Sequence, residues 1–425
     1  MTDTAGEWID AARAAERLGV KPATLYAYVS RGVLRRRRAP DGRRSLFDPD
    51  EIEELARRGR PRRPPGASEL VIESRITALG DDRPYYRGRD ALGLASSHAF
   101  EAVAEWLWSG ADPAPDGPRW RSRPEVVAVA RAAQSGLPEE TLPLDRLQVI
   151  AAALAAADPL RLVLDPPAVI AVGRQLLAGM VDALPAVAGG GEPPEATVAH
   201  RPPEATAAQR SAESSIAARL WPRLTSAEPW PPAIRALNAA LVLLADHELA
   251  ASTLAARVAA SVRADPYAVV TAGLGAAGGG LHGGASLGAE ALLAEIGAPG
   301  RAARVIGERL RRGERVPGFG GVVYQARDGR AGCLLDLVRA AAPGHERLAV
   351  AEAVLAEARS RGLPGVNIDF ALATLGAATG MGRGAGEAIF AVARTAGWLA
   401  HALEEYARGT PLRPRAIYTG PPRGR

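Results

Sequence analysis

Cysteine is almost absent from the 425 residues: Cys333 is the only one, so the chain can form no internal disulfide. A chain without disulfides fits a reducing compartment, and the first ten residues show neither the basic nor the apolar stretch of a secretory signal. No apolar run approaches the roughly 18–20 residues that a membrane span requires. We therefore expect a cytoplasmic protein that makes no membrane contact.

Aromatic residues are also scarce, at 5% of the chain, although 47% of its residues are apolar. The core must therefore rest on alanine, leucine and valine. Alanine and leucine favour helices, whereas aromatic and β-branched residues dominate strands. The composition thus predicts an all-α fold of closely packed helices. Lysine is nearly missing as well, with Lys21 alone, so the many arginines reflect a coding bias and carry no functional meaning by themselves.

Positive charge is concentrated near the N-terminus. The first 66 residues carry 15 basic and 10 acidic side chains, while the remainder holds 37 of each sign. The composition and the hydrophobic pattern of the sequence change at the same point. A chain of 425 residues is also too long for one small module. We predict a small domain at 1–56, a basic, proline-rich linker at 57–66 and a large domain at 67–425.

The small domain has the pattern of a winged helix-turn-helix. Apolar residues at helical spacing over 9–18 predict a first helix, and Pro22 opens a second one after a short turn. Asp41 and the glycine after it mark the tip of a hairpin between basic strands, and Pro49 begins a third helix. This segment resembles the DNA-binding heads of the MerR and excisionase type.

In such a head the second helix faces the bases, and the wing contacts phosphates. We therefore expect double-stranded DNA as a partner. The expected contact residues are Thr24, Tyr26, Tyr28 and Arg31 on the second helix and Arg36, Arg38, Arg43 and Arg44 on the wing. The alternative is a vestigial or protein-binding appendage whose arginines reflect the coding bias.

From residue 67 onward, helical patterns of alanine and leucine alternate with proline and glycine breaks. Residues 184–209 are rich in glycine, proline and glutamate, and we expect a long loop there. Helices are predicted at 99–109, 124–135, 143–157, 167–181, 232–246, 249–262, 285–296, 333–341, 346–361 and 386–408.

Glycines surround His282 within the stretch 275–297, and a helix follows. Glycine lets a backbone approach a ligand closely and adopt positive φ. At a helix N-terminus the dipole disfavours the imidazolium form, so a neutral ring can donate a hydrogen bond to a carbonyl. A flexible hinge with an incidental histidine would give the same pattern.

Three further residues stand out from their surroundings. Asp369 lies among apolar neighbours, where its pKa should rise, so it can act as a general base or cap a helix. Arg394 interrupts an apolar helical face and needs an anionic partner, either a structural carboxylate or a substrate. His247 is flanked by Asp246 and Glu248, as in a surface cluster or a metal site.

Taken in order, these stretches resemble the citrate synthase family over nearly all of 67–425, and the resemblance also includes 73–95, 316–332 and 412–420. It implies an almost wholly helical fold whose large subdomain and small subdomain, roughly 283–380, close over substrate. It also implies a homodimer whose active sites include one residue from the partner subunit. No cofactor and no metal are implied, since acetyl-CoA is a substrate.

The resemblance implies a role for each motif residue. His282 matches the histidine that stabilises the enolate of acetyl-CoA, and Asp369 matches the base that removes its methyl proton. Oxaloacetate would be held by His247, Arg330, Arg394 and Arg413, with Arg413 reaching across the dimer. The adenine of coenzyme A would be received by Val316, Pro317, Gly318, Phe319 and Gly320.

Gly321 departs from the family pattern, because a histidine usually stands there and polarises the ketone of oxaloacetate. Loss of one such donor costs about 100- to 1,000-fold in turnover. Tyr324 and Arg327 are candidates to replace it.

We expect an acyltransferase that condenses acetyl-CoA with oxaloacetate to citrate, and 2-methylcitrate synthesis from propionyl-CoA stays open. The alternative is a weakened synthase that senses CoA esters or dicarboxylates and controls DNA binding.

Overall fold

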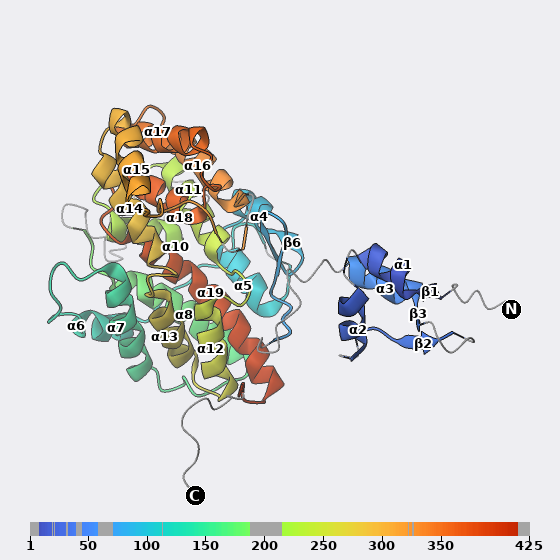
Figure 1. Ribbon diagram of the computed structural model, residues 1–425. Coiled ribbons are helices and arrows are strands. Elements are labelled where there is room, and N and C mark those ends of the chain that lie inside the picture. Colours follow the sequence, from blue (N-terminus) through green and yellow to red (C-terminus); the bar gives the residue numbers. More distant parts are fainter. Residues whose placement is uncertain are drawn as a thin grey trace, which may run out of the picture. The chain divides into compact units, whose positions relative to one another are not determined.

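The computed structural model describes residues 8–18, 20, 22–30, 33–39, 45–57, 71–112, 114–187, 215–321, 323–324 and 327–414. The chain separates into two compact units, Met1–Glu73 and Ser74–Arg425. Figure 1 shows the elements of each unit. Apart from Arg57, the predicted linker at 57–66 lies outside the described residues, as does most of the predicted loop at 184–209.

The smaller unit combines three helices with a three-stranded antiparallel sheet in the order β1-β3-β2. Its elements are β1 (Ile9–Asp10), α1 (Ala11–Leu18), α2 (Pro22–Ser30), β2 (Arg36–Arg38), β3 (Ser45–Phe47) and α3 (Pro49–Arg57). Leu25, Phe47 and Ile52, each from a different element, are fully buried in its core.

The helix-turn-helix prediction is confirmed in this unit. Helix α2 begins at Pro22, α3 begins at Pro49, and β2 pairs with β3 as the two strands of the predicted hairpin. The hairpin tip at Asp41 lies outside the described residues. The short strand β1 was not predicted, because two residues are too few to show a period.

The larger unit is helical except for a small antiparallel sheet in the order β4-β5-β6. The all-α prediction is therefore confirmed. Its elements are β4 (Thr77–Leu79), β5 (Pro84–Tyr86), β6 (Arg89–Asp90), α4 (Ala91–Ser97), α5 (Phe100–Ser109), α6 (Pro124–Ala132), α7 (Pro143–Ala156), α8 (Pro166–Ala183), α10 (Ile216–Leu224), α11 (Pro231–Leu244), α12 (Ala251–Ser261), α13 (Pro266–Ala277), α14 (Ala285–Ile296), η1 (Pro299–Arg301), α15 (Ala302–Arg311), α16 (Gly329–Ala341), α17 (Glu346–Ser360), α18 (Ile368–Thr379) and α19 (Ala385–Arg408).

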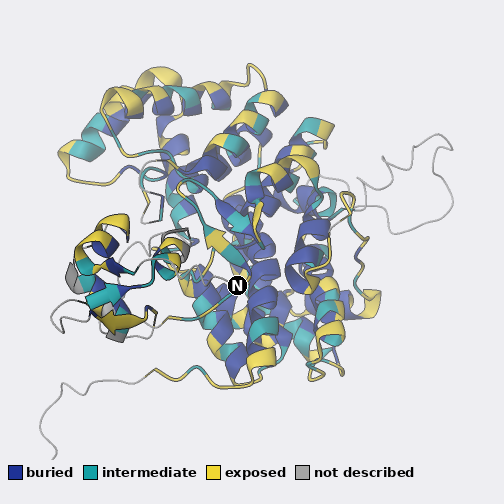
Figure 2. Ribbon diagram, turned by 90° about the vertical axis from the view of Figure 1, so that its right-hand side faces the viewer, coloured by how far each residue is buried: buried dark blue, intermediate teal, exposed yellow. Residues whose placement is uncertain are grey.

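Helix α19 forms the centre of the larger unit. It packs against α5, α7, α8, α11, α12 and α13 and is buried along most of its length. Figure 2 shows buried residues gathered in the interior of the larger unit and exposed ones on its outside. Small residues allow this close packing: a Cβ at Gly273 would lie 2.5 Å from the Trp398 ring, and a Cβ at Gly397 would lie 2.4 Å from the Ala245 carbonyl oxygen. Two polar groups on this helix, Arg394 and His401, are therefore held inside the unit.

Helices α14 to α18 lie together at one end of the larger unit in Figure 1. Helix α18 packs on α14, α16 and α17, and α16 also packs on α11. The larger unit is compact as a whole, so the division at roughly 283–380 stays a prediction. No helix among the described residues is long and apolar enough to cross a membrane.

Candidate active site

The backbone around His282 forms a tight turn before α14. The His282 amide donates to the Gly279 carbonyl at 2.8 Å, and the His282 carbonyl accepts from Ala285 at 3.1 Å. A Cβ at Gly283 would lie 2.6 Å from the Ala277 carbonyl oxygen, so a larger residue would displace the turn. Glycine is therefore required here for close backbone packing.

The His282 ring faces the N-terminus of α12. Its Nε2 accepts from the Ser252 backbone amide at 3.4 Å and lies 2.7 Å from the Ser252 hydroxyl. Amides in the first turn of a helix have no partner within the helix, so this contact also caps α12. Because an amide can only donate, the hydrogen-bond pattern assigns the ring proton to Nδ1. Sequence reasoning had credited the following helix, whereas the helix that faces the ring is α12.

Burial lowers the pKa of His282, and the positive charge of Arg394 lowers it further. The ring is therefore neutral near pH 7, with an Nδ1–H group that can donate to a ligand oxygen. Phe390 packs edge-on against it with the ring centres 5.4 Å apart.

Asp369 lies in the first turn of α18. Asn367 is the N-cap of this helix, and its Oδ1 accepts from the amides of Asp369 at 3.0 Å and Phe370 at 3.4 Å. The alternative that Asp369 caps the helix is thus wrong. Among the described residues no group donates a hydrogen bond to its carboxylate. Burial raises the pKa of Asp369 to about 6 against the pull of Arg330, which suits a general base.

A buried ion pair joins α16 to the start of α18. The Arg330 guanidinium donates to both Asp328 carboxylate oxygens at 2.9 and 2.8 Å, and the same carboxylate accepts from the Ile368 amide at 3.2 Å. Both side chains are buried. The pair therefore fixes Arg330 relative to the helix turn that carries Asp369.

His247 follows the C-terminal end of α11 and contacts Tyr324, with 3.0 Å between Nε2 and the hydroxyl oxygen. Burial lowers its pKa well below the usual value, and the nearby Arg330 and Arg394 lower it further. The Arg330 guanidinium also lies over the Tyr324 ring, 5.2 Å from its centre. Tyr324 thus brings His247 and Arg330 together.

Arg394 is 2% exposed and projects from the middle of α19. Its Nε donates to the Leu244 carbonyl at 2.8 Å, and its guanidinium lies 4.6 Å from the centre of the Phe390 ring. Within the described parts of the chain no carboxylate forms an ion pair with it. Burial lowers the pKa of Arg394 to about 10. A buried cation without an ion-pair partner is costly unless an anionic ligand arrives.

The segment Val316–Gly320 is docked on the start of α18. Gly318 and Gly320 have φ values of 84° and 80°, and a Cβ at Gly318 would lie 2.6 Å from the Phe370 Cβ. Asn367 holds the segment at two points, donating from its amide to the Gly318 carbonyl at 3.0 Å and from Nδ2 to the Gly320 carbonyl at 2.9 Å. The loop expected to receive CoA is therefore attached to the turn that presents Asp369.

Gly321 is exposed, and among the residues that the structure describes a Cβ built there would meet only the Tyr324 carbonyl oxygen, at 3.8 Å. A side chain would thus be tolerated. Of the two candidate substitutes for the missing histidine, Arg327 pairs with Asp82 at 2.7 Å and stays exposed. Tyr324, in contrast, is buried beside His247.

Arg413 does not join this cluster. It is exposed in the segment after α19, and the adjacent Leu412 amide donates to the Ser261 hydroxyl at 3.0 Å. Ser261 ends α12, whereas Ser252, which contacts His282, begins it. Nine residues of helix separate these two points by about 14 Å.

Sequence reasoning missed a buried polar network beneath His247. His401, on α19, lies 3.3 Å from the Asp246 carboxylate and 2.6 Å from an Arg257 nitrogen, and Arg257 pairs with Glu405. Asp246 therefore faces the interior, and the described residues contain no cluster of three or more potential metal ligands. His401 follows Arg394 by seven residues in an apolar helix, a spacing that puts both on one face.

In the smaller unit, the expected DNA-contacting side chains differ in exposure. Arg36 and Arg38 are exposed on β2, Tyr26 is 40% exposed on α2, and Thr24 is half-buried. Tyr28 is 8% exposed and packs in the core of the unit, so its predicted role in contacting DNA is corrected to a structural one. The structure does not describe Arg31, Arg43 and Arg44.

Two family models match the chain: "Citrate synthase, C-terminal domain" over residues 67–415 and "Helix-turn-helix domain" over residues 8–60. The first match covers most of the chain and includes the whole cluster around His282 and Asp369. The chain therefore belongs to the citrate synthase family.

Named relatives agree with this assignment. Citrate synthase 2 of Bacillus subtilis is 40% identical over 195 residues, which are 44% of this chain and 51% of that protein. The chain thus matches about half the length of that relative. Citrate synthase of Haloferax volcanii is 30% identical over 371 residues, 83% of this chain and 94% of that protein. A 2-methylcitrate synthase of Mycobacterium tuberculosis is 27% identical over 365 residues, 79% of this chain and 84% of that protein.

Solved structures show the same fold. Citrate synthase from Pyrobaculum aerophilum superposes with a TM-score of 0.68 at 25% identity, covering 92% of this chain and 96% of that one. The Thermoplasma acidophilum enzyme, in a ternary complex with carboxymethyl coenzyme A and oxaloacetate, gives a TM-score of 0.67 at 25% identity, covering 84% and 96%.

Proposed function

We propose that the protein condenses acetyl-CoA with oxaloacetate to give citrate and CoA. The observation that carries this proposal is that one group of residues holds both a candidate base and a neutral donor: Arg394 acts on the pKa of His282, Arg330 acts on that of Asp369, and the two arginines act on each other. Asp369 is a half-buried carboxylate that receives no hydrogen bond from the described residues, and His282 is a neutral ring whose Nδ1–H donates to none of them. Carbon-acid deprotonation needs both a base and a donor for the enolate oxygen.

In the proposed reaction, Asp369 takes a proton from the thioester methyl carbon while the thioester oxygen accepts from His282 Nδ1–H. The resulting nucleophilic carbon attacks the ketone carbon of oxaloacetate and forms the new carbon–carbon bond. The alkoxide takes a proton, and water then hydrolyses the thioester to release citrate and the CoA thiol. Closure of the two parts of the domain would protect the enolate from water.

The acceptor would bind among Arg330, Arg394 and His247. A dicarboxylate suits this group, because arginines hold carboxylates with paired hydrogen bonds and Arg394 has no ion-pair partner among the described residues. Tyr324 is the proposed donor to the ketone in place of the family histidine, since it contacts His247 and lies under Arg330. The Thermoplasma complex with oxaloacetate supports this acceptor by analogy.

Release of free thiol from acetyl-CoA in the presence of oxaloacetate tests the proposal. Asp369→Asn is the matched control, because it keeps the shape of the side chain and removes the base. Thiol release by the unaltered protein well above that of the control is the expected result. An equal rate for both proteins would overturn it. A parallel run with propionyl-CoA tests the 2-methylcitrate alternative, which the M. tuberculosis relative supports.

A second candidate function is binding of double-stranded DNA by the smaller unit. The match to a helix-turn-helix family and the exposed Arg36 and Arg38 on β2 favour it. In the proposed homodimer, two heads would suit a two-fold symmetric site. Affinity for a duplex should fall in an Arg36→Ala, Arg38→Ala variant and weaken steeply with added salt. If this variant binds duplex DNA as tightly as the unaltered protein, the wing does not bind DNA.

A further inference from the structure

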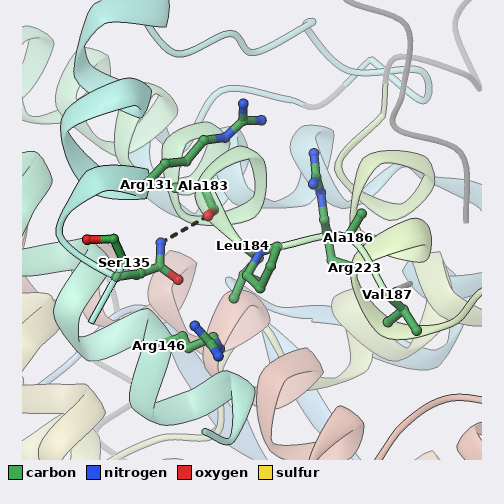
Figure 3. Close-up of a pocket in the computed structure, with 10 residues that line it drawn as sticks. Arg131, Ser135, Arg146, Ala183, Leu184, Ala186, Val187 and Arg223 are labelled. Carbon is green, nitrogen blue, oxygen red and sulfur yellow. Dashed lines mark hydrogen bonds between the residues drawn. The ribbon is translucent and has the colours of Figure 1, made fainter. Parts of the chain in front are cut away.

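The buried polar network beneath His247 has no role in the reaction steps proposed above. It is formed by Asp246, Arg257, His401 and Glu405. A separate pocket of about 510 Å³, bordered by α6, α7 and α10, is shown in Figure 3. No residue of the network lines that pocket, so a ligand bound in the pocket would not contact the network. The network contacts the candidate active site instead.

Helix α19 holds the end of α11, just before His247. The Arg394 Nε donates to the Leu244 carbonyl at 2.8 Å, and the Gly397 amide donates to the Ala245 carbonyl at 3.0 Å. Residues three and four apart on a helix share a face, so one face of α19 contacts two consecutive residues of the chain. The direction in which the chain leaves α11 is therefore fixed by α19.

The Asp246 carboxylate is the next group along the chain that α19 contacts. It is fully buried, and His401 Nε2 lies 3.3 Å from its Oδ2. A Cβ at Gly397 would lie 2.4 Å from Oδ1, so a glycine is needed to make room for the carboxylate. Oδ2 also accepts from the Glu248 amide at 3.1 Å. An aspartate that accepts from the amide two residues on closes a tight turn, and the middle residue of this turn is His247.

The backbone of this turn is strained. Glu248 has a φ of 56°, in the left-handed region that is unfavourable for a residue with a Cβ. The hydrogen bond from the Glu248 amide to Asp246 stabilises this conformation, and the Tyr86 hydroxyl lies 3.1 Å from the Asp246 carbonyl oxygen. The direction of the His247 side chain thus depends on the Asp246 carboxylate.

The orientation of the His401 ring is fixed from its other side. Arg257 Nη1 lies 2.6 Å from His401 Nδ1, and Arg257 is itself paired with Glu404 and Glu405. Because a guanidinium can only donate, Nδ1 accepts and the ring proton lies on Nε2. His401 therefore donates to Asp246.

Asp246 also supplies negative charge near Arg394. Burial opposes ionisation of Asp246, but His401 and Arg394 hold the pKa of its carboxyl below the usual value. In turn, burial lowers the pKa of Arg394, and the charge of Asp246 raises it. No ion pair joins the two side chains directly. Asp246 therefore favours the charged form of Arg394 without occupying the N–H donors that a substrate carboxylate would use.

We propose that Asp246, oriented by His401, is a positioning residue for the acceptor of the condensation. It fixes His247 through the turn and keeps Arg394 charged, and it does not itself touch the substrate. The proposal rests on the proposed function, because it concerns the oxaloacetate site of that reaction.

Binding of oxaloacetate to the full chain, measured by titration calorimetry without acetyl-CoA, tests this role apart from turnover. Asp246→Asn keeps an oxygen for the turn and removes the charge, and it should weaken oxaloacetate binding about tenfold. Equal affinity in this variant and the unaltered protein overturns the proposal, as does absence of binding by the unaltered protein. Oxaloacetate binding that weakens as expected, without thiol release from acetyl-CoA, supports the positioning role and contradicts the condensation alone.

Asp158→Asn is the matched control. Asp158 is 7% exposed and accepts from the Leu160 amide, two residues on, at 3.0 Å and from the Tyr267 hydroxyl at 2.7 Å. The control thus removes the charge from a similar buried turn outside the candidate site, and it should leave oxaloacetate affinity unchanged. The same loss of affinity in the control would make the effect of Asp246→Asn a general one and overturn the proposal.

Two substitutions of His401 separate positioning from folding. His401→Asn keeps an acceptor near the place of Nδ1, for Arg257, whereas His401→Gln keeps a donor near the place of Nε2, for Asp246. Oxaloacetate binding should weaken in the asparagine variant and recover most of its strength in the glutamine variant. Equal losses in both would assign His401 to the core alone and overturn its part in the proposal. Unfolding midpoints in urea confirm that each variant is folded.

Discussion

The candidate active site holds ionisable side chains that lack a hydrogen-bond donor or an ion-pair partner among the described residues. Among the described residues, no group donates a hydrogen bond to the half-buried carboxylate of Asp369, and no carboxylate pairs with the buried Arg394. Each is costly to bury alone, because a charged group loses its hydration. Their shifted pKa values express this cost. Ionisable side chains without a protein partner are typical of a site in which a substrate supplies the partner.

In the proposed reaction, the pKa of Asp369 sets the pH dependence of the condensation. Because burial raises it to about 6, the carboxylate is protonated and inactive as a base at lower pH. We expect kcat/KM for acetyl-CoA to fall about tenfold per pH unit below 6. A pH–rate profile measures this limb, and a flat profile between pH 4.5 and 7 would exclude Asp369 as the base.

The same shift affects stability with a defined sign. The folded state holds the Asp369 proton more tightly than the unfolded chain, whose usual value is 3.8. This group therefore contributes stability that is fully present below about pH 4 and lost as the pH rises through about 6. In urea denaturation, Asp369→Asn should gain stability relative to the unaltered protein across that interval. A constant difference from pH 4 to 7 would contradict the raised pKa.

In the proposed reaction, Tyr324 is the donor to the ketone of the acceptor. Replacing it with phenylalanine keeps the ring beneath Arg330 and removes the hydroxyl that contacts His247. We expect turnover to fall by about 100-fold, as for the loss of one donor in a closed site. Arg327→Gln is the control, since Arg327 is exposed and pairs with Asp82. A larger loss in the control than in Tyr324→Phe would reassign the donor.

At the scale of elements, the start of α18 connects the loop expected to bind CoA with the residue expected to act as the base. Asn367 caps this helix, holds the Gly318 and Gly320 carbonyls, and positions the backbone of Asp369. One side chain thus links the loop expected to bind CoA with the expected base. Loss of this residue should affect both binding and stability.

Asn367→Ala should lower the free energy of unfolding by about 1 kcal/mol through loss of the cap and should also raise the KM for acetyl-CoA. The matched control is Asp165→Ala, which removes the N-cap contact of α8 to the Ala168 amide. It should cost similar stability and leave KM unchanged. If both variants change KM alike, the effect of Asn367 is on stability alone.

The sequence predicted most long helices, because alternating apolar periods and proline or glycine breaks mark them. It missed α18, since a helix buried on nearly all sides has no polar face and therefore no period. It also missed α4, α10, which contains Pro222, α13 and α15. A signal that depends on one exposed face disappears when a helix is buried on nearly all sides, as α18 is.

Much of the candidate site could be predicted as a set of residues, but not as a geometry. His282, Asp369, His247, Arg330 and Arg394 were found from their unusual surroundings and the family resemblance. Ser252, which sets the tautomer of His282, is an ordinary serine in the sequence, thirty residues away. Contacts between distant segments depend on how the helices pack across one another. The hydrophobic pattern of a single sequence does not reveal this packing.

At the scale of the whole molecule, the chain joins a helix-turn-helix unit to a citrate synthase domain. The exposed Arg413 lies apart from the cluster within its own chain. This position is compatible with the proposed homodimer, in which Arg413 would complete the partner's site. The proposal can be tested through subunits that carry different lesions.

Arg413→Ala and Asp369→Asn should each abolish most activity when expressed alone. In mixed dimers, one site would carry both lesions and the other would carry none. Co-expression should therefore restore about a quarter of the unaltered activity if half of the dimers are mixed. No restoration would mean that Arg413 does not act across a dimer.

The central claim is that Asp369 and His282 activate a thioester methyl group for attack on a ketone. Its most direct test supplies acetyl-CoA labelled with ¹³C in the methyl carbon together with oxaloacetate, and follows the label by NMR. The account predicts that the label appears in a methylene carbon of citrate with the unaltered protein and not with Asp369→Asn. Free thiol accompanied by labelled acetate, with no labelled citrate, would contradict it.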